Sequence, residues 1–402
     1  CIRDRYRSNY PRIDGTAAQQ VLQSFGNEDA VLGPGGIRKQ RGKGQDLHEG
    51  RQFGSITRTA LTRNVASRFP RGTHATKRIR MATPLIRPLL TVLSPGGRHG
   101  RLSILIFHRV LATTDPLFPG EPDASRFDRI CATVGSWCNV IPLHEAVKGL
   151  ETGSLPARAT CLTFDDGYAD NYHNALPVLQ RHGLHATFFV ATGFLDGGRM
   201  WNDTLIEAIR ATDRAEIDLG DLGLGILAAG NIEEKRAAIT SIIPALKHRE
   251  PADRQDAVEL VARRCEVESL PDDLMLTSTQ LRGLHSAGMG IGAHTVSHPI
   301  LARCDEQTAR QEIADGRRQL EALLGERVGL FAYPNGKLDA DYTREHVGIV
   351  REQGFDAAVS TNPGASRTGD DLFQLSRFTP WDREPWRFGL RLARNLRQAP
   401  VA

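Results

Sequence analysis

The sequence lacks the features that mark membrane-spanning and fibrous proteins. Aromatic residues make up only 6% of its 402 residues, and no segment approaches the roughly 20 consecutive apolar residues that cross a bilayer. The best candidate, residues 83–93, is interrupted by Arg87 and by two prolines. The hydrophobic fraction of 40% and the charged fraction of 24% are those of ordinary globular proteins, which excludes collagen-like, coiled-coil and wholly disordered chains. We therefore expect a globular protein with no stable membrane span.

Cysteine is scarce and irregularly spaced. The six cysteines, at positions 1, 131, 138, 161, 265 and 304, form no CxxC pair, so we expect reduced thiols, several of them buried, and no disulfide framework. Cys131 and Cys138 could in principle form a zinc half-site or a disulfide. Their spacing of seven residues, with Trp137 between them, fits two core-facing positions on a helix better.

Methionine is absent before Met81, and acidic residues are few in the same segment. Residues 1–80 contain 16 Lys and Arg against 6 Asp and Glu, a net charge of +10, whereas the rest of the chain carries 35 against 41, a net charge of −6. Three explanations compete: a basic tail that binds nucleic acid or membrane phosphates, a cleavable targeting segment, and upstream sequence joined to a protein that starts at Met81. We favour the third, and we expect residues 1–98 to form a basic, disordered segment.

The segment after Arg80 is a poor export signal. A secretory signal needs an apolar region of about 7 to 15 residues after its positive residues, and residues 82–93 are broken by Pro84, Arg87 and Pro88. The sequence leaves localisation open, with a cytoplasmic location favoured over export, and the oligomeric state stays unknown.

From residue 102 onward, apolar segments of strand length alternate with helical patterns. Unbroken apolar runs are typical of strands buried on both faces of a parallel sheet, so this alternation predicts an α/β domain built around a parallel sheet or barrel. Residues 201–276 carry mostly helical patterns and no convincing strand, and we interpret them as a helical insertion. We expect strands at 102–107, 139–142, 159–164, 185–192, 289–294, 329–334 and 357–361, and helices at 125–138, 171–182, 278–287, 306–324, 342–353 and 384–397, the last on the surface.

Two carboxylates and two histidines follow apolar strands. Asp165 and Asp166 stand where one strand meets a glycine turn, and ligands of α/β proteins bind at the carboxyl ends of strands. His294 and His298 form an HxxxH pair directly after another strand, and one helical turn would bring both imidazoles to the same side. Either pair alone could be an ordinary surface feature. Together, two histidines and one carboxylate make a three-ligand zinc site with an open position for water.

Other residues at strand ends are weaker candidates. His108 follows the first strand in the same way as the two aspartates follow theirs. In the YPNG motif, a tight turn could expose the Tyr333 backbone N–H to a developing oxyanion, and Asn335 in the same turn could contact a substrate. Trp201 and Trp381 could stack on sugar faces, although large aromatic side chains more often belong to a core.

Three motifs in this order resemble the polysaccharide deacetylases of carbohydrate esterase family 4. They are TFDDG at 163–167, HTVSH at 294–298 and FAYPNG at 331–336, and the similarity covers about residues 102–380. The resemblance implies a deformed (β/α) barrel, here with a helical insertion, in a catalytic domain at residues 99–402. It also implies a divalent metal, usually Zn2+, and hydrolysis of an N-acetyl group, sometimes an O-acetyl group, on a sugar polymer.

Carried over residue by residue, the resemblance makes Asp165 the catalytic base and makes Asp166, His294 and His298 the metal ligands. Water activated by the metal would attack the acetyl carbonyl while Asp165 takes its proton. The metal and the Tyr333 N–H would hold the oxyanion.

Two positions depart from the usual family pattern. Many members have an arginine at the start of the third motif that orients the base, and Phe331 stands there in this chain, so we assign this role to Arg377 in QLSRF. The general-acid histidine of a late Leu-x-His motif is also absent, because LSR occupies 375–377 and no histidine follows His346. The chain is therefore similar to the branch that includes biofilm poly-N-acetylglucosamine deacetylases, in which the histidine after the first strand supplies the acid. His108 in FHRV matches that position.

The leading hypothesis is a metal-dependent hydrolase that removes acetyl groups from N-acetylhexosamine residues of an exopolysaccharide, oligosaccharide or cell-wall glycan. Hydrolysis of another small C–N bond and a catalytically silent glycan-binding protein stay open as alternatives. The insertion at 201–276 could roof the site, and a closed site would favour a small substrate over a polymer. Nucleic-acid binding rests only on residues 1–80, and the remainder is net negative without a DNA or RNA motif, so we expect no nucleic-acid partner.

Overall fold

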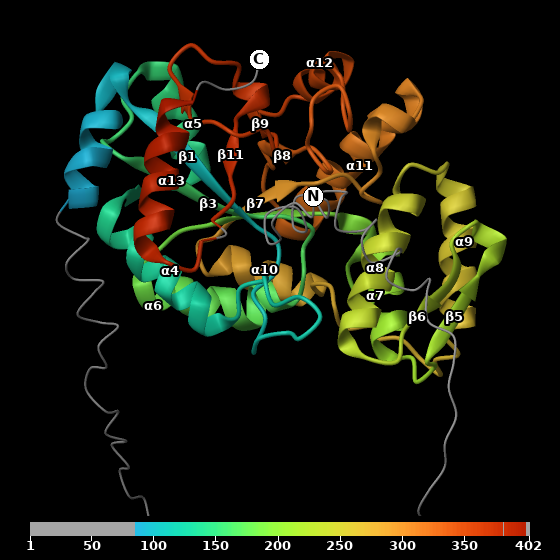
Figure 1. Ribbon diagram of the computed structural model, residues 1–402. Helices are drawn as coiled ribbons and strands as arrows, with labels where there is room; N and C mark the ends of the chain where they lie inside the picture. Colours follow the sequence, from blue (N-terminus) through green and yellow to red (C-terminus); the bar gives the residue numbers. More distant parts are fainter. Residues whose placement is uncertain (1–84, 381, 399–402) are drawn as a thin grey trace, which may run out of the picture. The chain divides into compact units, whose positions relative to one another are not determined.

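A computed structural model describes residues 85–380 and 382–398 of the chain (Figure 1). The predictions for residues 1–84 and for Trp381 lie outside the described residues. Residues 85–93 form a helix, so the prediction of a disordered segment over residues 1–98 is wrong for these nine residues. The reason is that Ile86 and Leu90 are buried in the main hydrophobic core. None of the helices in the described ranges has the length and apolar character needed to cross a lipid bilayer.

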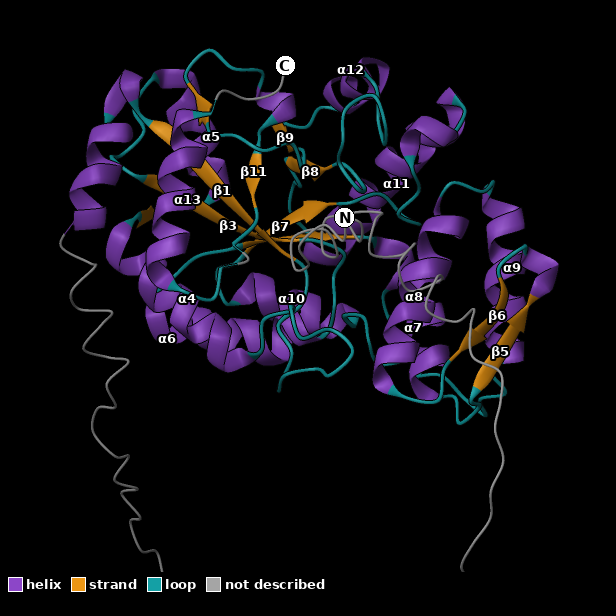
Figure 2. Cartoon of the chain, viewed as in Figure 1, coloured by secondary structure: helices purple, strands orange, loops and turns teal. Residues whose placement is uncertain are grey.

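A large, mostly parallel sheet lies at the centre, with helices around it (Figure 2). Its strand order is β10-β1-β3-β4-β7-β8-β9, with β2 paired to β3 and β11 paired to β1. Only β10 runs antiparallel to its neighbour. Every residue of β3, β4, β8 and β9 is buried, which explains their unbroken apolar sequences. The strands are β1 (Arg101–Phe107), β2 (Asn139–Val140), β3 (Ala159–Phe164), β4 (Thr187–Val190), β7 (Gly290–Ala293), β8 (Leu330–Ala332), β9 (Ala357–Val359), β10 (Ser366–Arg367) and β11 (Arg377–Phe378).

The sheet closes on itself through residues 375–378. Leu375 forms a parallel bridge with Val359 at the end of β9. Two residues later, β11 pairs with β1 in the register that places Arg377 opposite Ile104. The parallel strands and this closing segment therefore form a ring, which confirms the predicted deformed (β/α) barrel.

The helices begin where side chains cap their first N–H groups. Asp123, Asn231, Thr277 and Asp305 each accept a hydrogen bond from the N–H group three residues further on. The α-helices are α4 (Ala124–Trp137), α5 (Leu143–Thr152), α6 (Leu176–His182), α7 (Trp201–Ala211), α8 (Ile232–Lys247), α9 (Pro251–Arg264), α10 (Ser278–Ser286), α11 (Glu306–Leu324), α12 (Arg344–Glu352) and α13 (Pro385–Arg397). Short 3-10 turns occur at Gly97–His99, Thr192–Phe194, Gly220–Leu222, Leu301–Arg303 and Leu372–Gln374.

Two predicted helices differ in detail from those observed. Helix α4 starts before Ser125, because Asp123 caps it. The predicted helix at 171–182 divides into a π-helical turn, Asn171–Ala175, and α6. Pro177 lies at the start of α6 and has no N–H to donate, which fits the change in hydrogen-bond pattern at this point.

The insertion is not wholly helical, which corrects the prediction for residues 201–276. Between α7 and α8 the chain forms an antiparallel hairpin of β5 (Glu216–Leu219) and β6 (Gly225–Ala228). In β5, exposed and buried residues alternate, as expected for a strand with one face covered. The strands have four residues each and are separated by a glycine-rich turn. Their alternation of apolar and polar residues is too short to be distinguished from the helical patterns on either side. The insertion has a hydrophobic core cluster of its own, formed by α7, β5, α8 and α9.

Five of the six cysteines lie in the described part of the chain. Cys131, Cys138, Cys161 and Cys265 are buried, Cys304 is partly buried, and all five are free. Burial raises the pKa of both Cys138 and Cys265 to about 11, so these thiols are protonated at neutral pH. The prediction that several of the cysteines are buried is confirmed by four of these five residues.

Helix α11 makes a close approach to the turn that carries the HTVSH motif. A Cβ atom added at Gly316 would lie 2.8 Å from the carbonyl carbon and oxygen of Thr295, closer than side chains tolerate. A Cβ atom added at Gly348 in α12 would meet nothing within 4 Å. Glycine at 316 is therefore required by packing.

Replacing Gly316 with alanine should lower the free energy of unfolding by about 1–3 kcal/mol, because the added methyl group forces the helix and the turn apart. Gly348→Ala is the matched control and should be neutral or stabilising by about 0.5–1 kcal/mol, since alanine is the better helix former. Urea unfolding followed by circular dichroism measures both. Equal stabilities of the two variants would contradict the close contact.

Candidate metal and catalytic site

Three of the predicted residues converge at the carboxyl ends of two parallel strands, β3 and β7, which flank β4 in the sheet. Asp166 follows β3, and His294 and His298 lie in the turn after β7. Their ligand atoms all lie within 4.8 Å of one another. The Nε2 atoms of His294 and His298 are 3.5 and 3.4 Å from Oδ1 of Asp166. The structure therefore brings together the three side chains expected to hold a metal.

The backbone at this group is held in a conformation that non-glycine residues rarely adopt. Asp166, Thr295 and His298 have φ angles of +79°, +66° and +53°. Such left-handed residues cost of order 1–3 kcal/mol each and persist where the surroundings enforce them, often at functional sites. Two of these three residues, Asp166 and His298, supply donor atoms to the group.

A hydrogen bond fixes which nitrogen of His294 faces the group. Its Nδ1 lies 2.7 Å from the carbonyl oxygen of Ala332 in β8. Because a carbonyl can only accept, Nδ1 carries the proton, and Nε2 keeps its lone pair for a ligand. Two imidazoles and one carboxylate match the donor preference of Zn2+, so these residues fit a divalent metal of that kind.

The charge states also suit metal binding. Burial raises the pKa of the Asp166 carboxyl, but its interactions with the side chains of His294, His108 and His298 outweigh burial and hold the pKa well below its ordinary value. Burial lowers the pKa of His298 to about 3, against the opposing effect of Asp166. At neutral pH the group therefore offers an ionised carboxylate and a neutral imidazole, the forms that bind metal ions.

Glu312 on α11 holds the histidine turn from outside. Its Oε2 accepts hydrogen bonds from the backbone N–H groups of Val296 and Ser297, at 2.9 and 2.8 Å, and its Oε1 accepts from the Ser297 hydroxyl at 2.7 Å. Gly316, one helical turn further along, allows the approach. The role of Glu312 could not be predicted from the sequence, because 14 residues separate it from His298 and no local pattern links the two.

Asp165 and Arg377 form a buried, two-point ion pair. Nη1 and Nη2 of Arg377 donate to Oδ1 and Oδ2 of Asp165, both at 2.7 Å, and each residue is 2% exposed. Nε of Arg377 donates to the Ser360 carbonyl at 2.7 Å, which fixes the plane of the guanidinium. The structure thus places Arg377 on Asp165, where the sequence analysis assigned an orienting arginine. The catalytic roles of both residues stay predictions.

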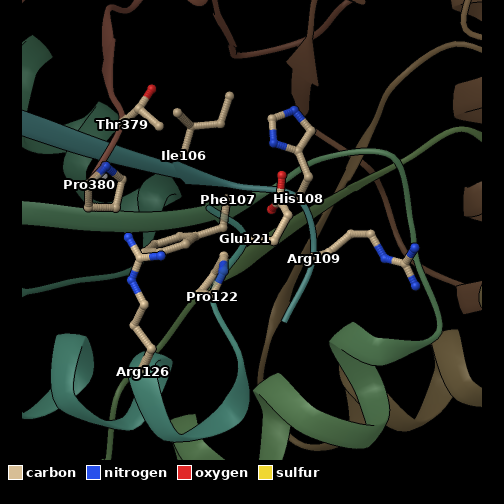
Figure 3. A pocket seen from close by; sticks show the side chains of 9 residues that line it. All are labelled: Ile106, Phe107, His108, Arg109, Glu121, Pro122, Arg126, Thr379 and Pro380. Atoms are coloured by element: carbon tan, nitrogen blue, oxygen red, sulfur yellow. The ribbon is translucent and has the colours of Figure 1, made fainter. Parts of the chain in front are cut away.

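His108 lies at the end of β1 and is buried (Figure 3). It directly follows Phe107, which is paired with Phe164 of β3, so His108 lies beside the strand end that carries Asp165 and Asp166. It lines a pocket, and the side chain of Arg109 extends away from it. The other residues that line the pocket are Ile106, Phe107, Glu121, Pro122, Arg126, Thr379 and Pro380.

The predicted oxyanion donor is already engaged. The backbone N–H of Tyr333 donates to the Val359 carbonyl at 3.2 Å, within the pairing of β8 and β9. The ring of Tyr333 stacks on the ring of Tyr342, with 3.9 Å between the ring centres, and the Tyr333 hydroxyl donates to the Phe373 carbonyl at 3.0 Å. The Tyr333 N–H is therefore not free to face an oxyanion, which corrects the prediction. The sequence pattern could not show this, because β8 continues its hydrogen bonding one residue beyond its last assigned position.

Two further candidates have contacts that leave their roles as predictions. Asn335 has a φ of +59° in the YPNG turn, and its carbonyl accepts a hydrogen bond from Thr361 at 2.8 Å. Trp201 begins α7 and is half-buried against the core of the insertion. The guanidinium of Arg254 lies 5.2 Å from the centre of its ring.

A polar network next to the candidate site was not predicted from the sequence. Nε of Arg109 donates to Asp170 at 2.7 Å, and the Val110 N–H donates to the same carboxylate at 3.0 Å. The Arg109 guanidinium lies 4.7 Å from the centre of the Tyr168 ring, and the Tyr168 hydroxyl donates to both oxygens of Asp203 in α7, at 3.0 and 3.1 Å. The network joins the end of β1, the loop after β3 and the insertion. A partial signal existed, because Arg109 follows His108 directly and Tyr168 follows the DDG turn.

Residues 152–219 and 253–358 match the family model described as polysaccharide deacetylase. This domain belongs to the polysaccharide deacetylase family. The resemblance stated from three sequence motifs is thereby confirmed. The unmatched stretch between the two parts, residues 220–252, lies within the insertion and contains β6 and α8.

Comparison with individual proteins gives partial matches. The chain is 21% identical to YxkH of Bacillus subtilis over 220 residues, which cover 55% of this chain and 50% of that protein. It is 31% identical over 81 residues to the poly-beta-1,6-N-acetyl-D-glucosamine N-deacetylase of Staphylococcus epidermidis, covering 20% of this chain and 28% of that protein. Among solved structures, it is similar to IcaB from Ammonifex degensii, with a TM-score of 0.48 and 20% identity, covering 75% of this chain and 98% of that chain. The chain spans half or less of the length of the two curated relatives.

Glu312→Ala should weaken zinc binding by about 10- to 100-fold, because the turn that carries His294 and His298 loses its outer hydrogen bonds. Isothermal titration of the metal-free chain with zinc measures the affinity. Glu306→Ala, on the same helix and exposed in its pair with Arg310, is the control and should bind zinc normally. An unchanged affinity in a folded Glu312→Ala protein would show that the turn holds its shape without this contact.

Proposed function

We propose that the chain is a metal-dependent hydrolase that removes N-acetyl groups from N-acetylhexosamine residues of a polysaccharide or oligosaccharide. The observation that carries the proposal is the pairing of Arg377 with Asp165 directly beside Asp166 and the two histidines. A buried carboxylate with fixed orientation next to a three-donor metal group is the arrangement that hydrolytic attack by water requires. Membership of the polysaccharide deacetylase family supports the reaction class.

In the proposed reaction Asp165 is the base. When bound, the metal supplies Lewis acidity to the acetyl carbonyl and to the attacking water. Asp165 takes a proton from that water as its oxygen adds to the carbonyl carbon. Arg377 contributes because its two-point contact fixes the direction of the carboxylate.

His108 is proposed to complete the reaction as the acid. Breaking the C–N bond requires a proton on the leaving nitrogen, because a free amide anion is a very poor leaving group. His108 gives that proton, and the products are acetate and an amine on the sugar. The proposal is supported by the position of His108 at the end of β1, beside the end of β3 that carries Asp165 and Asp166, and by its place on the wall of a pocket.

The substrate class rests on the relatives. The Staphylococcus epidermidis protein is named for the deacetylation of poly-beta-1,6-N-acetyl-D-glucosamine, so a glucosamine polymer is the first substrate to test. Zinc is the proposed metal because of the donor set. A small C–N substrate and glycan binding without turnover are the alternatives that the same experiment separates.

The full chain should release acetate from N-acetylglucosamine oligomers when zinc is added, and chelator should abolish the release. Asp165→Asn removes the base without changing its size and should lower the rate by about 100-fold or more, and His108→Ala should lower it by a similar factor. Enzymatic assay of acetate measures the rate. If the folded, zinc-loaded chain binds the oligomers without releasing acetate, the binding-only alternative replaces this proposal. Full activity of His108→Ala would remove the acid role alone.

Arg377→Ala should lower kcat by about 100-fold with little change in zinc content, because the base loses its orientation. The substitution also leaves a buried carboxylate unpaired, a loss of about 3–5 kcal/mol of stability. Arg377→Lys is therefore measured beside it, since lysine keeps the charge and loses the two-point geometry. Arg327→Ala, which breaks a similar two-point pair with Asp356 on the surface, is the control. Near-normal kcat in a folded Arg377→Ala protein would exclude an orienting role.

A further inference from the structure

Exposed apolar side chains are concentrated on two helices at one side of the barrel. Six large hydrophobic residues are exposed in the described part of the chain, and five of them lie on the helix of residues 85–93 and on α13. They are Leu85 at 78%, Leu89 at 38%, Val92 at 78%, Trp386 at 47% and Leu390 at 51%. The sixth, Ile226, lies on β6 of the insertion. We call the first five residues the apolar stripe.

The two helices contact each other, so the stripe is shared between neighbouring elements. A Cβ atom added at Gly389 would lie 2.9 Å from Cδ1 of Ile86. Ile86 and Leu90 on one helix, and Phe388, Leu392 and Leu396 on the other, are buried in the same hydrophobic core. In Figure 1 the blue helix at the start of the described chain and the red helix α13 lie on the same side of the sheet.

The spacing of the stripe gives each helix an outward apolar face beside its buried one. Leu85, Leu89 and Val92 follow the i, i+4, i+7 pattern of one helix face. Trp386 and Leu390 follow the i, i+4 pattern, and the exposed Arg394 continues their line at i+8. Both helices are therefore apolar on more of their circumference than their packing against the barrel uses.

The charged residues of the two helices have one sign, although Asp382 and Glu384 lie just before α13. The two helices contain Arg87, Arg387, Arg391, Arg394 and Arg397 and no acidic residue. All five are exposed except Arg391, which is partly exposed and pairs with Asp382 at 2.7 Å. The guanidinium of Arg387 lies 5.2 Å from the centre of the Trp386 ring. A mixed surface of guanidinium groups and apolar side chains, with an aromatic ring between them, complements an anionic lipid surface, in which phosphates lie directly above the acyl chains.

We propose that the helix of residues 85–93 and α13 dock the protein on the surface of an anionic bilayer. The helices lie along the interface, the apolar stripe enters the boundary between headgroups and acyl chains, and the arginines contact lipid phosphates. The docking is peripheral and reversible. The proposal stands independently of the proposed hydrolase activity, because none of the stripe residues belongs to the site.

Vesicle sedimentation of the full chain tests the proposal. The chain should bind phosphatidylcholine vesicles that contain phosphatidylglycerol, bind pure phosphatidylcholine vesicles much more weakly, and release from the anionic vesicles as salt is raised. The double variant Trp386→Ala, Leu390→Ser should lower binding by about tenfold or more. Ile226→Ser, at the exposed apolar residue outside the stripe, is the matched control and should bind as the unchanged chain does. Thermal unfolding establishes that each variant is folded.

A second measurement does not depend on loss of binding. Lipids with brominated acyl chains should quench tryptophan fluorescence on vesicle binding, and Trp386→Phe should remove most of the quenching. Three results overturn the proposal: no sedimentation with anionic vesicles, equal losses in the stripe variant and in Ile226→Ser, and anionic binding that the stripe variant retains in full. The last result would assign the binding to the basic residues 1–80 instead.

Discussion

The buried pair of Asp165 and Arg377 is the constraint on which the barrel and the site both depend. A charge removed from water costs several kcal/mol unless a partner with good geometry compensates it, and each of these two residues is 2% exposed. Arg377 can reach Asp165 only when residues 375–378 lie between β9 and β1, and this placement is also what closes the sheet. The same contact therefore sets the register of the last strand and the direction of the proposed base.

The group of Asp166, His294 and His298 depends on the barrel in a different way. Its donors follow β3 and β7, but their orientation is imposed by groups on other elements: the Ala332 carbonyl in β8 for His294, and Glu312 on α11 for the turn between the histidines. These contacts offset the strain of left-handed residues such as Asp166 and His298. The donor geometry is thus a property of four elements together, and no single motif could hold it.

The difference between local and distant contacts explains how much of this could be predicted from the sequence. The unbroken apolar runs and the polar residues after them predict the barrel and the positions of Asp166, His294 and His298, because parallel strands bring their carboxyl ends to one edge. Because Phe331 stands where many family members have an orienting arginine, Arg377 was predicted to take that role. In the structure Arg377 contacts Asp165. The hairpin of β5 and β6 was missed because four-residue strands between helices leave little periodicity. The engaged N–H of Tyr333 was missed because the strand that pairs with it lies more than twenty residues away.

The insertion is attached to the site by a contact that the sequence gives no reason to expect. Asp203 on α7 is 4% exposed, and its carboxylate accepts hydrogen bonds from the hydroxyl of Tyr168, which follows the DDG turn directly. Arg109 packs on the face of that ring and pairs with Asp170, so the same network also holds the residue next to His108. The family match includes α7 and stops at residue 219. The unmatched residues 220–252 lie beyond α7 and contribute to the insertion's own core. The insertion therefore has a core that is separate from its contact with the strand ends, and that contact is made by its first helix through Asp203.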